Sequence, residues 1–300
     1  VTWVPATANL PQLSDFTHMV AVGDIDNDGH LDIFAGNGAL ESSYVLLGDG
    51  TGQFIKTTAP LPAMFGVGGT SLLLADMDLD GRQDLIWGSN YDSRQHQIFW
   101  SDQSYFAGST GSALPAPTNF GTQWSIMDIE AIDVNFDALP DLVIAYQAQV
   151  TDGGWLLQVL INQGDRTFSD ETNHYIPEVS AVSSGVPSSS SAQAWIQFLQ
   201  PRDLNHDGLM DFWVDGKAWG GKILPDTFPV ALLHQTDGSF AAVTVGALRA
   251  EGMIDGFFWG LGYAERGPDQ SAEFVQFFSS PGSNTVQLNT TPVIFTPSLT

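Results

Sequence analysis

The chain has 300 residues, 43% hydrophobic and 11% aromatic, enough for one large core or two modest ones, so disorder is a poor interpretation. With 34 acidic against 9 basic residues the formal net charge is −25, so the surface repels phosphate backbones and nucleic acid is not an expected partner. Cysteine is absent, which excludes thiol catalysis but permits export, and no run approaches the roughly 18 apolar residues of a membrane helix, so no membrane insertion is expected.

An acidic repeat runs along the chain, and in each copy a short apolar strand leads into an Asp-rich loop and a second apolar strand leaves it. The clear copies read VAVGDIDNDGHLDIFA at 20–35, LLLADMDLDGRQDLIW at 72–87, IEAIDVNFDALPDLVI at 129–144 and LQPRDLNHDGLMDFWV at 199–214. A weaker fifth copy, VTVGALRAEGMIDGFF, covers 243–258.

A second strand–turn–strand element follows the acidic repeat. It reads YVLLGDGTGQFIKT from Tyr44, LLQVLINQGDRTFSDET from Leu156 and VALLHQTDGSFAAVT from Val230, and it is degenerate in the second copy. FVQFFSSPGSNTVQLN from Phe274 is the counterpart in the fifth. Each unit therefore holds about four short strands, the content of one propeller blade. We predict an all-β fold, a β-propeller of about five four-stranded blades.

The predicted blades form a single domain spanning 1–300. They cover 16–60, 68–120, 124–175, 194–242 and 243–300. The Ser-rich stretch 179–193 is predicted to be a loop inserted between blades. The opening VTWVPATANLPQL resembles FIKTTAPLPAM after the first copy, so Val1–Val4 either closes the ring against the last blade or belongs to a longer array.

The acidic loops have the spacing of a calcium site. Carboxylates at positions 1, 3 and 5 of a tight loop converge on one point, and the position-7 carbonyl and the position-9 Asp add further oxygens. Four such carboxylates cannot all ionise without a cation, and a flexible all-oxygen set selects calcium over magnesium. The predicted ligands are Asp24, Asp26, Asp28, the His30 carbonyl and Asp32; Asp76, Asp78, Asp80, the Arg82 carbonyl and Asp84; Asp133, Asn135, Asp137, the Leu139 carbonyl and Asp141; Asp203, Asn205, Asp207, the Leu209 carbonyl and Asp211.

Two loops depart from the pattern. The third has Ala138 where position 6 favours glycine, so we expect a weaker site there. The fifth has lost the acids at positions 1 and 3, and Arg249 stands at position 3. We predict that Arg249 replaces the metal by pairing with Glu251 and Asp255, which leaves three to four Ca²⁺ ions per chain.

These motifs resemble the FG-GAP or VCBS repeats of bacterial surface proteins and of integrin α-subunit propellers. The resemblance rests on GDIDNDGHLD, ADMDLDGRQD, DVNFDALPD and RDLNHDGLMD, with trailing elements such as LLGDGTGQF, and covers nearly the whole chain. It implies calcium at hairpins within each blade, in proteins of adhesion or ligand binding or in accessory modules of secreted enzymes. It maps no ligand-binding residue onto this sequence.

No catalytic set can be assigned, since the motifs of serine hydrolases, zinc proteases and phosphate-binding loops are missing from the sequence. His174 and Tyr175 are either the base and acid of a polysaccharide lyase or two polar loop residues. Trp124, Trp195 and Trp219 are candidates for ligand binding, because exposed aromatic faces suit sugar rings, with core packing as the alternative.

Three functions fit these features. The first is an extracellular, calcium-stabilised binding propeller that recognises a glycan or a protein, secreted, on the cell surface or in the periplasm, where calcium is abundant. The second is a polysaccharide-degrading enzyme of the lyase type or its accessory domain. The third is a scaffold within a larger secreted toxin or adhesin.

Overall fold

The structure is a computed structural model. It describes residues 9–11, 15, 17–37, 42–62, 69–89, 96–102, 105–117, 124–148, 154–177, 194–218 and 224–252, and the backbone of 260–266, 271–280 and 283–293. Val1–Val4, the Ser-rich stretch 179–193, Trp219 and Asp255 lie outside the described residues.

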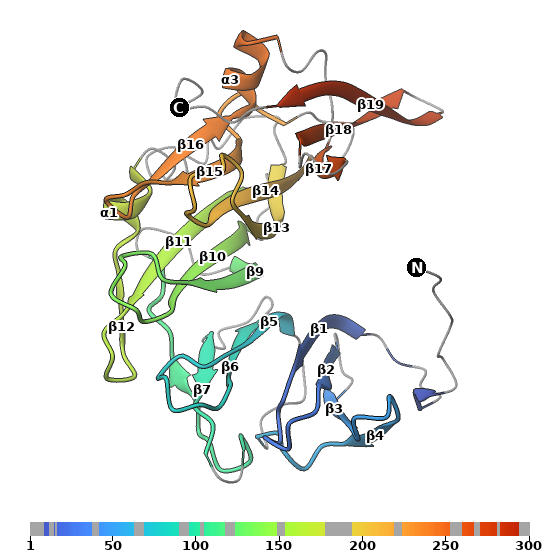
Figure 1. Cartoon of the computed structure of the whole chain (residues 1–300), viewed down its shortest axis with the longest axis vertical. Helices are drawn as coiled ribbons and strands as arrows, with labels where there is room; N and C mark the ends of the chain where they lie inside the picture. Colours follow the sequence, from blue (N-terminus) through green and yellow to red (C-terminus); the bar gives the residue numbers. More distant parts are fainter. Residues whose placement is uncertain are drawn as a thin grey trace. The chain divides into compact units, whose positions relative to one another are not determined.

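The described chain is almost entirely antiparallel β-sheet, which confirms the predicted all-β class (Figure 1). Three sheets have four strands each, ordered as they occur along the chain. They are β1 (Thr17–Gly23), β2 (Asp32–Asn37), β3 (Tyr44–Gly48) and β4 (Phe54–Thr57); β5 (Gly69–Ala75), β6 (Asp84–Ser89), β7 (Gln97–Phe99) and β8 (Ser112–Ala113); β9 (Trp124–Ile132), β10 (Asp141–Ala148), β11 (Trp155–Asn162) and β12 (Phe168–Asp170).

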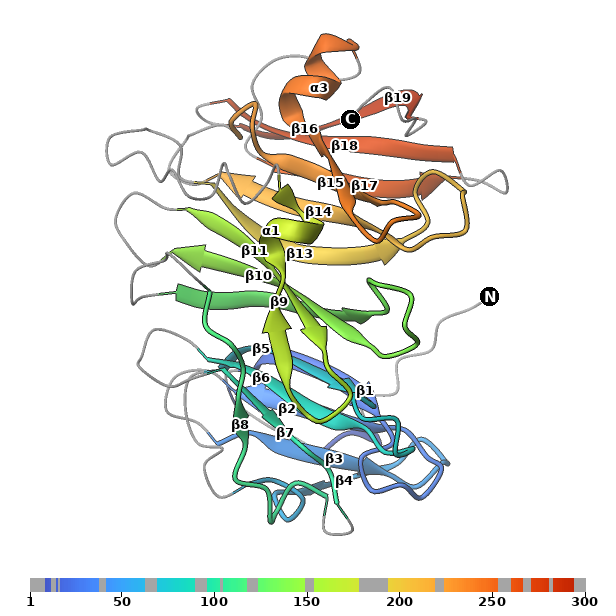
Figure 2. The ribbon, with the colours of Figure 1, turned by 90° about the vertical axis from the view of Figure 1, so that its left-hand side faces the viewer.

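The fourth sheet begins in the same way and is then extended. Its strands are β13 (Ala194–Arg202), β14 (Asp211–Ala218), β15 (Pro229–His234) and β16 (Phe240–Thr244), joined by β17 (Gly260–Arg266), β18 (Ser271–Ser280) and β19 (Ser283–Val293). The far end of β14 pairs with β17, Gly216 opposite Leu261. Each four-stranded meander is a propeller-type blade (Figure 2).

The chain divides into two compact units. The first comprises 1–116 together with the turn 162–168, and the second comprises 117–161 and 169–300. Each unit has its own apolar core. In the first, Phe34, Leu85 and Phe99 are fully or almost fully buried, and in the second β11 and β15 are buried along their whole length. The single domain predicted for 1–300 remains a prediction.

The acidic repeats become the first hairpin of each blade. In all four, the position-9 Asp is the first residue of the second strand and faces the last residue of the first strand. The pairs are Gly23 with Asp32, Ala75 with Asp84, Ile132 with Asp141 and Arg202 with Asp211. Positions 1 to 8 are therefore the loop that closes each hairpin.

The fifth repeat folds differently from the strand–loop–strand that the sequence predicts. Helix α3 (Val245–Ala250) follows β16 directly, and its N-cap Thr244 accepts a hydrogen bond from the N–H of Ala247. The fifth repeat has no acids at positions 1 and 3, and Val245 and Leu248, three residues apart, are buried on one helix face. Arg249 forms an ion pair with Asp226, in the turn before β15, a partner that the sequence did not predict. Its predicted pairing with Asp255 lies outside the described residues and stays a prediction.

Candidate calcium sites

The position-1 aspartate organises each acidic loop. Asp24 Oδ1 accepts the N–H of Asp28 at 3.0 Å, and its Oδ2 accepts that of Gly29 at 2.9 Å. The same two bonds, from positions 5 and 6, recur at Asp76, Asp133 and Asp203. At position 5, Oδ1 accepts the position-7 N–H in every loop, as in the 2.8 Å bond from His30 to Asp28. Four different sequences thus adopt one loop conformation.

The position-9 aspartates are buried. Asp32 Oδ2 accepts the N–H of Ile25 in the loop, while its Oδ1 accepts that of Gly48 at the end of the third strand, both at 2.8 Å. Asp84 and Asp211 make the equivalent pair of bonds, and Asp141 accepts from Val134. Burial raises the pKa of Asp84 and of Asp211 to about 6, although the N–H donors oppose the shift.

The loop conformation requires left-handed backbone at positions 4 and 6. Position 6 has φ between 88° and 90° at Gly29, Gly81 and Gly208, and 71° at Ala138. The third loop therefore closes in the same way as the others but carries a β-carbon in a region that costs roughly 1–2 kcal/mol for a residue other than glycine. This backbone cost is the physical reason to expect a weaker calcium site at the third loop, which stays a prediction.

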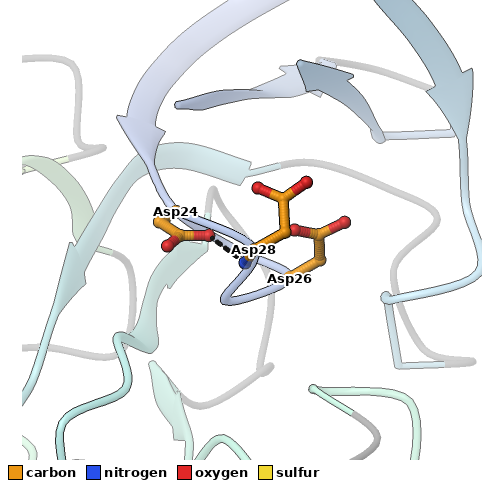
Figure 3. A group of neighbouring side chains, drawn as sticks. All are labelled: Asp24, Asp26 and Asp28. Atoms are coloured by element: carbon orange, nitrogen blue, oxygen red, sulfur yellow. Dashed lines mark hydrogen bonds between the residues drawn. The ribbon is translucent and has the colours of Figure 1, made fainter. Parts of the chain in front are cut away.

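The first loop fits a cation. Ligand oxygens of Asp24, Asp26 and Asp28 lie within 4.8 Å of one another, and Figure 3 shows the three side chains around one turn of the loop. Oδ1 of Asp26 is buried without a hydrogen-bond partner. Burial, followed by the carboxylates of Asp32 and Asp28, raises the pKa of Asp26. A Ca²⁺ ion would satisfy that oxygen and supply the missing positive charge, so the residues present suit calcium.

The second loop also has aspartates at positions 1, 3, 5 and 9, and in addition two arginines contact it. Oxygens of Asp76, Asp78 and Asp84 lie within 4.8 Å of one another. Arg166, from the turn after β11, donates from Nε to Asp78 Oδ2 at 2.8 Å, and Arg82 forms an ion pair with Asp80.

The third and fourth loops lower their charge with an amide at position 3. Asn135 donates to Asp137 Oδ2 at 2.8 Å, and Asn205 donates to Asp207 Oδ2 at 2.9 Å. Each of these loops therefore carries three carboxylates, and a hydrogen bond replaces one repulsion.

Three contributors were missed by sequence reasoning. Arg166 contacts the second loop, and the side chains of Asn162 and His234, at the ends of β11 and β15, contact the position-2 carbonyls of Met77 and Val134 at 2.7 Å and 2.9 Å. These contacts span 85 to 100 residues, so no local pattern reports them. A signal for Arg166 did exist, since QGDRT aligns with DGTGQ and QTDGS and has arginine where they have glycine.

The candidate catalytic pair lies on α1 (Thr172–Tyr175). The rings of His174 and Tyr175 meet edge to face at 4.7 Å, with His174 exposed and Tyr175 half-buried. Burial, with Asp141, Glu171 and Asp137, raises the pKa of Tyr175, so the phenol stays protonated. The structure assigns the pair no reaction, so its catalytic role stays a prediction.

Two of the candidate ligand-binding tryptophans, Trp124 and Trp195, are described, and both are half-buried. Trp124 begins β9 and Trp195 is the second residue of β13, so both lie at the end of their blade away from the acidic loop. Lys217 lies opposite Trp195 on β14, with its Nζ 6.0 Å from the ring centroid.

The meander sheets and their acidic hairpins define a β-propeller-type protein with Asp-rich loops. Residues 24–87 and 76–144 match the family model of the FG-GAP-like repeat. The matched residues contain the first three acidic loops, so this part of the chain is similar to that family. The fourth loop lies beyond the matched residues but makes the same hydrogen bonds.

Several solved structures resemble the chain at low identity. An Agrocybe aegerita lectin described for specific recognition of non-reducing terminal N-acetylglucosamine shares 18% identity with a TM-score of 0.49, over 91% of this chain and 66% of that chain. The exotype rhamnogalacturonan lyase YesX shares 14% with a TM-score of 0.44, over 91% and 47%. A thermostable family-43 glycoside hydrolase shares 8% with a TM-score of 0.39, over 92% and 95%. These likenesses assign no function.

The search of curated proteins found no match to this sequence. Among the residues that the structure describes, no helix is long and apolar enough to cross a membrane.

Proposed function

We propose that this chain is an extracellular binding propeller, stabilised by calcium, that recognises a glycan or a protein. The observation that carries the proposal is the repetition of one loop conformation in four blades, each with oxygens at positions 1, 3, 5 and 9 of a tight hairpin. Ordinary Asx turns would need neither the shared spacing nor a buried, partnerless oxygen such as Asp26 Oδ1.

Calcium has a structural role in this proposal. The side chains at positions 1, 3, 5 and 9 and the position-7 carbonyl would hold the ion. The loop gathers carboxylates that repel one another, so a cation bound only in the folded state adds its binding free energy to the stability of the hairpin. Outside cells calcium reaches millimolar levels that saturate weak sites, which is why we place the protein there.

The ligand site belongs at the opposite end of the blades. Trp124 and Trp195 occupy similar places at the start of neighbouring first strands of the second unit. A half-buried indole beside an ammonium group offers both a stacking face and a hydrogen-bond donor, a combination that suits a sugar ring or a protein side chain. In this arrangement calcium supports the scaffold and does not contact the ligand.

The calcium part is tested by metal counting and thermal unfolding. We expect three to four Ca²⁺ ions per chain and a drop in melting temperature of about 10 °C or more on chelation, reversed by calcium but less by magnesium. An unchanged melting temperature with no bound metal would return the loops to ordinary turns.

The ligand part is tested on a glycan array and with extracellular protein pools in calcium. Trp195→Ala should weaken binding by roughly tenfold or more, while leaving the calcium-dependent shift in melting temperature intact. Phe198→Ala, which removes a 48% exposed aromatic ring from the same strand, is the matched control. Release of shortened or unsaturated sugars from an uronate polymer would instead support an enzyme.

A further inference from the structure

The second acidic loop contains its own positive charge. Arg166 binds Asp78 at position 3, and Arg82 binds Asp80 at position 5. The side chain of Asp78 is only 10% exposed, so its charge needs a partner more than a surface carboxylate does. In the first loop the position-3 carboxylate, Asp26, has no cationic side chain bound to it among the described residues, and it keeps one buried oxygen without a hydrogen-bond partner.

Arg166 stands where related turns have glycine. Three turns between third and fourth strands close with the same backbone bond, from Asp49 to Gln53, Gln163 to Thr167 and Gln235 to Ser239. Their fourth residues are Gly52, Arg166 and Gly238, with φ of 87°, 65° and 86°. The left-handed region disfavours a residue with a β-carbon, so an arginine at this position carries a local backbone cost that glycine does not.

Its neighbours fix the arginine over the loop. Within the first unit, the Asn162 side chain donates to the Met77 carbonyl at 2.7 Å, which holds the turn against the loop. The guanidinium carbon lies 5.2 Å from the Trp100 ring centroid, and Trp100 stacks on Phe168. The side chain is therefore held at both its base and its head.

The third loop shows the alternative arrangement. There the turn residue is Gly238, and a β-carbon at that position would come within 2.9 Å of the Val134 carbonyl. No side chain can enter from this glycine, and the loop has Asn135 in place of a position-3 aspartate. The aspartate thus occurs together with the arginine, and the asparagine together with the glycine.

We propose that Arg166 is an internal cation of the second loop. Together with Arg82 it replaces much of the positive charge that calcium supplies to the first loop. The second loop therefore keeps its conformation without calcium and binds calcium more weakly than the first. This inference rests on the proposed calcium function of the loops, and it names one loop in which that function is reduced.

The test compares the two loops in the intact chain by hydrogen exchange, with calcium and with excess EGTA. In the wild type, we expect chelation to speed exchange at 24–32 strongly and at 76–84 little. Arg166→Gly supplies the residue that the related turns carry, so the turn should close at least as well. It should make 76–84 as chelator-sensitive as 24–32, and in calcium titrations it should tighten one weak site roughly fivefold to tenfold.

Three variants control for other effects. Arg166→Lys keeps the charge and should behave as the wild type in both measurements. Arg82→Gln lies outside the 162–168 turn and should move 76–84 in the same direction as Arg166→Gly. Arg249→Gln removes an arginine–aspartate pair that lies outside the four acidic loops, and should change the exchange of neither loop.

The outcomes separate this inference from the proposed function. Equal chelator sensitivity of both loops in the wild type, or unchanged calcium binding in Arg166→Gly, overturns the inference alone. If no calcium binds at all, the proposed function fails. Hydrogen exchange of the Arg166 variants in EGTA then tests the inference by itself. Faster exchange at 76–84 in Arg166→Gly than in Arg166→Lys would still identify an internal cation, and equal exchange would reject it.

Discussion

The first and second acidic loops have the same backbone conformation but differ in how the negative charge of their carboxylates is neutralised. In both, the position-1 carboxylate accepts the N–H groups of positions 5 and 6, and the position-9 carboxylate is buried against two further N–H groups. The first loop leaves an oxygen of Asp26 partnerless, whereas the second pairs Asp78 and Asp80 with arginines. The comparison separates what shapes the loop from what neutralises it.

The largest expected effect concerns the buried position-9 aspartate, which both loops share. Asp32→Asn and Asp84→Asn each place an amide NH₂ against a buried backbone N–H, leaving one donor unsatisfied. Each should lower the free energy of unfolding by about 2–3 kcal/mol in the presence of chelator, where the hydrogen bonds alone count. Denaturant unfolding measures it, with exposed Glu251→Gln as the control. A much milder effect at Asp84 would mean that the arginines also support the hairpin.

A smaller effect concerns position 6. Gly29 and Gly81 have the same φ of 88°, and an added β-carbon would meet nothing within 4 Å in either loop. Alanine at either position should therefore destabilise through the backbone alone, by about 1 kcal/mol. Ala138→Gly should stabilise the third loop by a similar amount. Thermal unfolding of the three variants checks this, and unequal effects at Gly29 and Gly81 would show that the two backbones differ.

The smallest effect is a pH dependence of the calcium-free second loop. Burial raises the pKa of folded Asp84 to about 6, above its ordinary value of 3.8. At a pH between these two values the folded state holds a proton that the unfolded state has released. This contribution to stability is complete below about pH 4 and is lost as pH rises through 6, with about 1 kcal/mol of it present at pH 5.

Unfolding in EGTA at pH 5 and pH 7 measures that dependence. Asp84→Asn should reduce the difference between the two pH values, while Asp49→Asn, an exposed carboxyl in another turn, should leave it unchanged. Calcium should also suppress it, because a bound cation keeps Asp84 ionised. A wild-type stability that rises from pH 5 to pH 7 in EGTA would contradict the assigned pKa.

Sequence alone predicts the blades because their signals are local. The apolar strands of six to nine residues that flank each acidic loop, the Asp or Gly residues of the loop and the fixed spacing of positions 1 to 9 all lie within one hairpin. The structure forms a hairpin at each clear copy. The fifth copy failed as a hairpin because spacing without acids at positions 1 and 3 leaves Val245 and Leu248 free to form a helix face.

Charge compensation could not be predicted in the same way. Arg166 is 88 residues from Asp78, and Arg249 forms an ion pair with Asp226, 23 residues before it. The sequence predicts an arginine in place of a metal only at the fifth repeat, and Arg166 is outside every acidic repeat. The identity of the cation at each loop therefore depends on packing between blades, whereas the shape of the loop depends on its own nine residues.

Because its own aspartates and the left-handed residue at position 6 already close each acidic hairpin, position 3 and the facing turn can change without loss of the fold. A lineage carrying such repeats can therefore drift in its need for calcium one blade at a time, exchanging an ion for an arginine or an amide. Relatives living where calcium is scarce should have accumulated such exchanges, each in step with the residue opposite.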